Sequence, residues 1–493
     1  MPPPADNQHV QRRWHRSIQA LAIFQDFLIW EMKQEWSPEE CDALYLKTAA
    51  CFEKQHDTVM AVRCYDLCGR HAKVIQLLER HAHEDPRHGH FRELQPYYLA
   101  IPEDEATSSP DLMVGLSMVS FLRADFDVSR LWYDRLCVYA ARPGHSLEEQ
   151  KQLEAYIRYL DIVCLVRSAD SVVDLMPLIA QGMDEDEPAY RNFTFSVTSG
   201  LPSIINGGRD SSVWTLDDAA LYREFAKPVE RALGADGVCL PDCAVAESAL
   251  LRGEDVRARM LGIASKIQDI YLHGSPDTEF AATGLLARTQ VNYGSAEDAH
   301  QTILKIRESF LAHGEDFFIP NIDAMLARLA FRTGASSAGE RWYRAKAPKE
   351  LLRPCTMDRH VYMTLAEVEV ARGCPGQALA VLAPWRRIFE RCEHAIDLIM
   401  LDTIAAIAIS RTEEEGGIYE NPNGKGGSWR EPLARALASA SRFSFVQPIA
   451  TFGIAVVPCS RSRTGTRTRS SSPGQSLSLG SRRRSIRRSR SRQ

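Results

Sequence analysis

Residues 246–258 read AESALLRGEDVRA, and three later segments share their spacing: ARTQVNYGSAEDA at 287–299, ARLAFRTGASSAG at 327–339 and AEVEVARGCPGQA at 366–378. The repeat is marked by four glycines at intervals of 41, 40 and 39 residues, Gly253, Gly294, Gly334 and Gly373. A small residue lies seven positions before each glycine (Ala246, Ala287, Ala327, Ala366) and another five positions after it (Ala258, Ala299, Gly339, Ala378). An apolar residue lies three positions before each glycine: Leu250, Val291, Phe331, Val370. Each copy predicts a helix, a tight turn and a second helix, and the fixed period predicts an all-α solenoid of helical pairs.

Two looser copies lie upstream of these four. One has its turn at His56 between Ala49 and Ala61, and the other is centred on Ala124, between Ser117 and Ser129. The twelve-residue separation of the small pair resembles that of tetratricopeptide repeats, stretched from 34 to about 40 residues. The ninth position after each turn adds a larger packing residue on the same helix face, although Gly262 breaks the pattern: Tyr65, Tyr133, Ile303, Tyr343, Leu382. We expect residues 11–455 to form one helical repeat domain.

Local signals place several helix boundaries. Ser37 with Glu40, and Ser146 with Glu149, have the spacing of capping boxes. We expect helices at about 11–35, 38–54, 57–69, 72–81, 91–102, 111–123, 127–141, 146–167 and 431–441, and a buried helix over 395–409. Residues 188–215 are interpreted as an irregular repeat and loop, and 416–427 as a loop.

The ends of the chain differ from the body in composition. Residues 1–10 and 460–493 are expected to be disordered, because neither segment can bury a core. The second segment contains eleven of the 59 basic residues and none of the 64 acidic ones, so the remainder carries about −16. An acidic body is a poor surface for nucleic acid. The Arg/Ser-rich tail leaves open a further hypothesis, that the chain binds RNA or DNA through this tail. Such binding would depend steeply on the salt concentration.

No run of about 18 apolar residues and no signal peptide is found, so we expect a cytoplasmic chain with no membrane partner. The twelve cysteines are expected to be reduced, mostly buried thiols. Cys64 with Cys68, and Cys239 with Cys243, do not have the spacing of a zinc knuckle.

Candidate chemical sites are weak. Residues 423–428 (NGKGGS) have the residue types of a phosphate loop without its spacing. The histidines His81, His83, His88 and His90 crowd a helix end, where they could bind a metal or simply be solvated. An aromatic stripe could be core or could line a ligand groove: Trp132, Tyr133, Trp342, Tyr343. We predict no enzyme, no catalytic, cofactor-binding or metal-binding residue and no cofactor, and the ligand-binding residues stay unassigned.

Residues of about 20–455 resemble the helical sensor region of LuxR-type, MalT-like transcriptional regulators. The resemblance begins with Phe24–Leu28, the 37–40 capping box, residues 49–52 (AACF) and residues 77–81 (LLERH). Leu94, the residues 97–99 (YYL), Ile101-Pro102 and residues 110–112 (PDL) look like that family's "L-x-x-W-L-x-x-L-P … P-x-L" junction, with Tyr98 near the usual tryptophan. Residues 436–440 (ALASA) and 443–448 (FSFVQP) resemble its closing repeat.

The resemblance implies a ligand-sensing and protein-interaction module whose concave groove takes a small-molecule inducer or a protein partner. Family members join such a module to an ATP-binding domain and a helix-turn-helix. This sequence has no Walker A motif and no recognisable helix-turn-helix, so DNA would be reached only through a missing or separate domain. The abrupt change after Cys459 suggests the hypothesis that the Arg/Ser tail is an out-of-frame reading. The alternative is a stand-alone tetratricopeptide-like scaffold that binds proteins.

Overall fold

The computed structural model describes residues 31–32, 34–84, 91–164, 198–233, 237–349, 355–414, 416 and 427–456. Within these ranges the chain is helical, with no strand and one isolated bridge between Asn206 and Asp210. The predicted all-α class is therefore confirmed. The predicted disordered ends, most of the first predicted helix and most of the 416–427 loop lie outside the described residues. None of the described helices combines the length and the apolar composition needed to cross a membrane.

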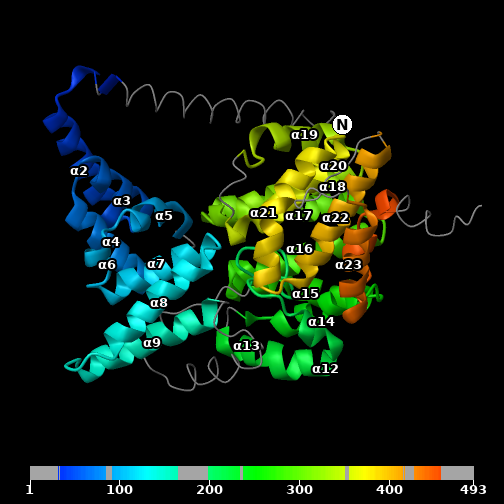
Figure 1. Cartoon of the computed structure of the whole chain (residues 1–493), viewed down its shortest axis with the longest axis horizontal. Coiled ribbons are helices and arrows are strands. Elements are labelled where there is room, and N and C mark those ends of the chain that lie inside the picture. Colours follow the sequence, from blue (N-terminus) through cyan, green and yellow to red (C-terminus); the bar gives the residue numbers. More distant parts are fainter. Residues whose placement is uncertain are drawn as a thin grey trace, which may run out of the picture.

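The N-terminal block consists of helices α2 to α9, drawn in blue and cyan in Figure 1. Their bounds are α2 Pro38–Lys54, α3 Thr58–Leu67, α4 His71–Glu84, α5 Phe91–Leu99, α6 Glu103–Ala106, α7 Pro110–Leu122, α8 Phe126–Ala140 and α9 Leu147–Val163. Both predicted capping boxes are confirmed, because the hydroxyl oxygens of Ser37 and Ser146 each accept the N–H of the glutamate three residues later. The backbone N–H of the same serine donates to the carboxylate of that glutamate. Each cap satisfies otherwise unpaired N–H groups at a helix start.

A connecting segment follows the N-terminal block. Residues 198–211 run without regular helix and lead into η3 Ser212–Leu216, α12 Asp218–Ala220, the π-helical turn η4 Leu221–Ala226 and α13 Lys227–Leu233. The irregular part is mostly buried, which is unusual for a loop. The expectation of an irregular segment over 188–215 is confirmed for residues 198–211, whereas residues 212–215 belong to η3.

The C-terminal block runs from green to red in Figure 1. Its elements are α14 Leu240–Leu251, α15 Arg257–His273, α16 Pro276–Asn292, α17 Ala296–His313, η6 Asp316–Phe318, α18 Ile319–Arg332, α19 Ser336–Ala345, η7 Thr356–Asp358, α20 Arg359–Ala371, α21 Pro375–Arg391, α22 Ala395–Glu414, α23 Arg430–Arg442, α24 Gln447–Ala450 and η8 Gly453–Val456. Each helix of a pair packs on its partner, and first helices of neighbouring pairs also pack on one another, as α18, α20 and α22 do. The predicted buried helix is α22, whose Ile399 and Ala408 have no exposed surface.

Every marked turn has a backbone conformation with positive φ. The four glycines have φ between +78° and +86°, and each lies between the two helices of a pair. His56 and Ala124, predicted as turns of the looser copies, both have φ of +60°. Glycine adopts this region at little cost, whereas other L-residues are strained in it.

The small residues are the contact points of the pairs. Ala49 and Ala61 have no exposed surface, and the Ser117 hydroxyl donates to the Ser129 carbonyl oxygen at 3.0 Å. Ala258 is an exception, because it is exposed. Since α15 begins four residues after its turn glycine rather than two, its buried face is formed by Val256, Met260 and Ile263. The same shift explains why Gly262 breaks the packing pattern.

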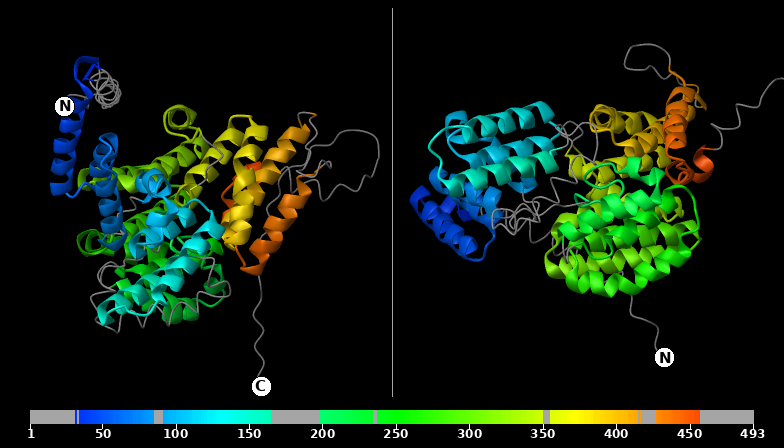
Figure 2. Two further views of the ribbon diagram at one scale, coloured as in Figure 1. Left: turned by 60° about the vertical axis from the view of Figure 1, so that its left-hand side comes forward. Right: turned by 90° about the horizontal axis from the view of Figure 1, so that it is seen from below.

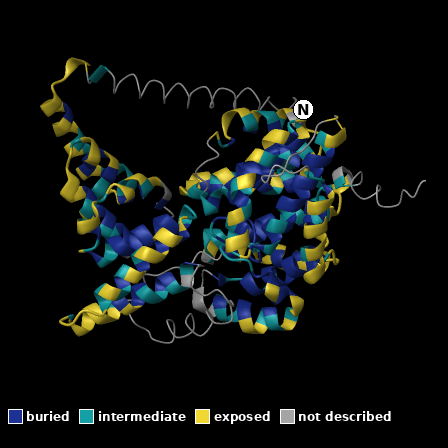
Figure 3. Ribbon diagram, in the orientation of Figure 1, coloured by how far each residue is buried: buried dark blue, intermediate teal, exposed yellow. Residues whose placement is uncertain are grey.

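The two blocks meet at the C-terminal end of α21. Ile388 and Cys392 pack against the apolar core of the N-terminal block, and Arg391 forms an ion pair with Asp127 of α8. Figure 1 and the right-hand view of Figure 2 show the N-terminal block beside the C-terminal one, and Figure 3 shows a buried interior in both.

Candidate ligand pocket

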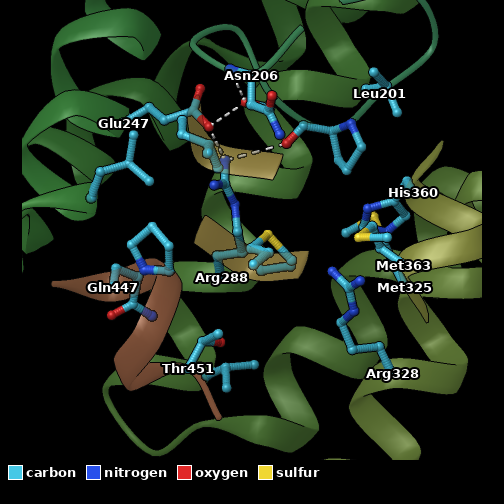
Figure 4. Close-up of a pocket in the computed structure, with 18 of the residues that line it drawn as sticks. Leu201, Asn206, Glu247, Arg288, Met325, Arg328, His360, Met363, Gln447 and Thr451 are labelled. Atoms are coloured by element: carbon cyan, nitrogen blue, oxygen red, sulfur yellow. Dashed lines mark hydrogen bonds and ion pairs between the residues drawn. The ribbon is translucent and has the colours of Figure 1, made fainter. Parts of the chain in front are cut away.

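The C-terminal block contains a partly open cavity of about 170 Å³. Its wall comes from the first helices of successive pairs, α14, α16, α18, α20 and α22, together with the segment 201–206, one residue of α17 and the region around α24. Figure 4 shows most of the following lining residues: Leu201, Pro202, Ser203, Asn206, Glu247, Arg288, Met325, Arg328, Arg332, Arg359, His360, Met363, Asp397, Met400, Gln447 and Thr451. Engineered apolar cavities of about 150 Å³ hold benzene, so this space suits a small molecule.

Glu247 fixes the segment that covers one side of the cavity. Its carboxylate accepts the Ser203 hydroxyl at 2.6 Å and the N–H groups of Ile204 and Ile205 at 2.8 and 3.1 Å. It also pairs with Arg288 at 2.6 Å, and that guanidinium donates to the Pro202 carbonyl oxygen at 3.2 Å. A buried carboxylate is stable only when such partners replace water. The cluster therefore holds the covering segment against α14 and α16.

Arg359 and Asp397 hold the next part of the same segment. The Arg359 Nε lies 2.9 Å from the Asp397 carboxylate, and the Arg359 Nη2 donates to the carbonyl oxygens of Asn206 and Gly207. The Asn206 amide donates to Asp397 Oδ1 at 2.9 Å. Asp397 has a lowered pKa despite the opposing effect of burial, because Arg359 and its hydrogen bonds favour the ionised form.

The region around α24 forms the opposite rim. The Val446 N–H donates to the Leu251 carbonyl oxygen at 2.8 Å, and the Gln447 amide donates to Asn292 at 2.7 Å. Arg332 of α18 donates to the Thr451 hydroxyl at 2.6 Å. Elements that are far apart in the sequence therefore meet around one cavity.

The pocket wall is rich in arginine. Arg288 pairs with Glu247 and Arg359 with Asp397, whereas Arg328 and Arg332 share Glu367 at 3.1 and 2.8 Å. These four guanidinium groups thus have ion pairs with three carboxylates in the described part of the chain. Burial lowers the pKa of Arg328 to about 10, as expected for a cation that is incompletely compensated.

His360 lies close to Arg328 on the neighbouring helix (Figure 4). Its Nε2 and the Arg328 Nη2 are buried and have no hydrogen-bond partner within the described residues. Burial, followed by the charges of Arg328, Arg288, Arg359 and Arg332, holds the pKa of His360 well below its usual value. The imidazole is therefore neutral at pH 7.

Methionines supply the apolar part of the pocket. Met325, Met363 and Met400 lie along it with Leu251, Leu329 and Ile396. Flexible thioether side chains adapt to irregular shapes and suit promiscuous or variable ligands. The cavity thus has a cationic side and an adaptable apolar side.

The sites considered from the sequence lie elsewhere. Tyr133 and Trp342 are buried in core clusters, and Tyr343 donates to Glu369 at 2.7 Å, so the aromatic stripe serves packing. Its fourth member, Trp132, is partly buried beneath the Arg135 guanidinium. None of these four residues lines the cavity.

The histidines, the 423–428 loop and the cysteines, which were the other candidates from the sequence, also give no candidate site within the described residues. His81 is buried and hydrogen-bonds the Tyr98 hydroxyl at 3.1 Å, whereas residues 88 and 90, the His83 side chain and most of the 423–428 loop lie outside the described residues. The described cysteines are free thiols. Within the described ranges no three potential ligands gather as a metal site would require.

Sequence reasoning missed the pocket residues, although a signal exists. The sixth position before each turn glycine is charged in all four copies: Glu247, Arg288, Arg328, Glu367. Each follows a buried alanine on the first helix of its pair, and together they form the pairs Glu247–Arg288 and Arg328–Glu367 between neighbouring helices. A charge at a fixed, core-facing repeat position is costly unless paired, and that regularity could have indicated the site.

Comparison with models of known families gives no match, and searches among curated proteins and among solved structures give none either.

Proposed function

We propose that this chain is a ligand-sensing and protein-interaction module built as a tetratricopeptide-like solenoid of helical pairs. The observation that carries the proposal is the cavity itself, whose wall runs from Leu201 to Thr451. A ligand there contacts first helices of successive pairs and both covering segments at once. Binding would favour the arrangement in which these contacts exist, by the difference in affinity between the two arrangements.

The junction of the two blocks offers a route by which such a change could be transmitted to the N-terminal block. Arg359 lines the ligand pocket and also a smaller cavity beside the junction, together with Phe121 and Leu122 of α7 and Ile388 of α21. The carbonyl groups that Arg359 holds belong to the covering segment. A ligand that moves this segment would therefore act on residues next to the N-terminal block.

The same observation weighs against the alternative of a peptide-binding scaffold. In such a scaffold the first helices would line an open groove for a partner. Here the chain's own segments 201–206 and 447–451 line that space, and the remaining cavity of about 170 Å³ suits a small molecule.

A thermal-shift screen tests the proposal with neutral sugars, amino acids, organic acids and short peptides. We expect at least one small compound to raise the melting temperature of the natural chain in a dose-dependent manner. Met400→Trp fills the cavity and should abolish the shift, and Thr451→Trp at the partly exposed rim does so with less risk of overpacking. Leu261→Trp, on an exposed face of α15, is the matched control and should keep it.

An equal shift in melting temperature in the Met400→Trp and Thr451→Trp variants would contradict the proposal. Stabilisation by peptides alone would also contradict it and would favour the protein-binding scaffold.

The context of a MalT-like, LuxR-type regulator is supported by the resemblance of residues 20–455 alone. We propose it with a separate test: reading the coding locus in all frames on both sides of this chain. An ATP-binding domain upstream and a helix-turn-helix in another frame after Pro458 would support a regulator. An intact homologous Arg/Ser tail in expressed protein would refute the out-of-frame hypothesis.

A further inference from the structure

We propose that the pocket binds a small organic anion, with its carboxylate or phosphate group held by Arg328 and His360. This inference rests on the proposed ligand-sensing function and specifies the chemistry of its ligand. It depends on three features of the cavity: its charge, its unpaired hydrogen-bonding groups and its apolar side.

The charge balance favours an anion. Glu247 is fully used, because its two oxygens accept Arg288, the Ser203 hydroxyl and two backbone N–H groups. Glu367 alone serves both Arg328 and Arg332. Asp210 also attracts Arg359 but does not line the cavity. A ligand carboxylate would supply the counter-charge that the shared carboxylate only partly provides.

Unpaired groups mark where the anion would lie. The Arg328 side chain is 12% exposed, and its Nη2 has no hydrogen-bond partner in the described chain. The His360 Nε2 is likewise unpartnered and can donate in the tautomer that carries its proton there. Figure 4 shows both side chains on the same side of the cavity, next to Met325 and Met363. A buried donor without an acceptor is destabilising, and an anion that accepts from both groups would remove this penalty.

The ligand must also carry an apolar part. The wall beyond Arg328 is formed by Met325, Met363 and Met400, and the cavity is only slightly larger than one that holds benzene. A free inorganic ion would leave this apolar volume empty. An aromatic or branched-chain acid of similar size fills both parts.

Calorimetric titration with four probes that share one phenyl ring tests this chemistry: benzoate, phenyl phosphate, benzamide and benzylamine. We expect benzoate or phenyl phosphate to bind at least about tenfold more tightly than the neutral and cationic analogues. Whichever of the two anions binds more tightly identifies the group as carboxylate or phosphate. Acetate and inorganic phosphate, which lack the apolar part, should bind more weakly than either.

Arg328→Met keeps an unbranched apolar stem, removes the guanidinium group with its charge and should weaken anion binding by about tenfold or more. Arg386→Met is the matched control. Arg386 shares Asp402 with Arg435 as Arg328 shares Glu367 with Arg332, but it lies outside the cavity. The control should bind the anion as the natural chain does, and unchanged melting temperatures of both variants without ligand would show that they fold.

The outcomes separate the two proposals. Binding of benzamide as tight as that of benzoate, blocked by Thr451→Trp, would overturn the anion inference and leave the sensing function standing. Equal loss of affinity in Arg328→Met and Arg386→Met, no loss in either, or no binding of any probe would also overturn it. Compounds that bind only outside the pocket would overturn both.

Discussion

The N-terminal and C-terminal blocks use the same helical pair but fill its interior differently. In both blocks a turn residue with positive φ joins two helices that meet at small residues. In the N-terminal block the fully buried polar residues are serines and His81, with no carboxylate or guanidinium among them in the described ranges. The C-terminal block buries a set of charged side chains: Glu247, Asp323, Arg359, Glu369, Asp397, Asp402.

This difference separates packing from function. Burying a charge costs several kcal/mol, and pairing it often does no more than offset that cost. The N-terminal block shows that the helical pair closes well with an apolar core. The charges of the C-terminal block are therefore not needed to build the pair. Glu247, Arg359 and Asp397 lie on first helices and line the cavity, whereas Asp323, Glu369 and Asp402 form ion pairs outside it.

Among the substitutions that test this difference between the blocks, we expect Glu247→Ala to have the largest effect on stability. Glu247 is 1% exposed, and its loss leaves Arg288 and three donors of residues 203–205 without their acceptor. We expect the free energy of unfolding to fall by roughly 3 kcal/mol or more, measured by urea denaturation. Glu308→Ala, on an exposed position of α17, should change it by less than about 0.5 kcal/mol. A loss below about 1 kcal/mol in Glu247→Ala would show that the covering segment does not depend on this carboxylate.

The sequence predicted the helical pairs that both blocks share better than it predicted the pocket of the C-terminal block. Turns, caps and small contact residues depend on local geometry, so the capping box of Ser37 and the turn at Ala124 could be placed from spacing alone. The charged repeat position of Glu247 carried a signal for part of the pocket, but the covering segment 198–206 has no periodicity and could not be placed from the sequence. The shifted register of α15 left a trace in the sequence, because Gly262 breaks the pattern, but that trace alone does not give the position at which the helix begins.

Two glycines inside first helices offer the next largest effect. A Cβ on Gly115 would lie 2.3 Å from the Tyr98 ring in the N-terminal block, and one on Gly284 would lie 2.5 Å from Pro202 of the covering segment. Overpacking costs about 1–3 kcal/mol and outweighs the gain of about 1 kcal/mol in helix propensity. Both alanine variants should lose stability, but only Gly284→Ala should also weaken benzoate binding in calorimetry. Equal affinity in the two variants would show that the covering segment does not shape the pocket.

The pH dependence of stability should have opposite signs in the two blocks. The folded-state pKa of His360 is lowered, so the unfolded chain binds a proton that the folded chain does not. Its contribution to stability is therefore lost as the pH falls below about 6.5, by up to about 1.4 kcal/mol per pH unit. Burial raises the pKa of Asp161 in α9 to about 6, so its contribution improves as the pH falls through that value.

Urea denaturation of His360→Gln and Asp161→Asn between about pH 5 and 7.5 measures these slopes as differences from the natural chain. The His360 variant should gain stability relative to the natural chain as the pH falls, and the Asp161 variant should lose it. The Asp161 slope should be the shallower one because that group is only half-buried. Slopes of the same sign would mean that His360 is protonated in the folded chain, and the charge arrangement of the pocket would need revision.

The smallest effect concerns two corresponding turns, at Gly294 in the C-terminal block and at Ala124 in the N-terminal block. Gly294 has φ of +86° and open space around its missing Cβ, so Gly294→Ala adds backbone strain without a clash and should cost about 1 kcal/mol. Ala124 has φ of +60°, and Ala124→Gly should remove comparable strain while adding entropy to the unfolded chain, for a net gain of about 0.5 kcal/mol. Melting temperatures should therefore shift in opposite directions. If Ala124→Gly is instead destabilising, the N-terminal turn is held by side-chain packing, and the two blocks share a helical pair but not the way in which it is closed.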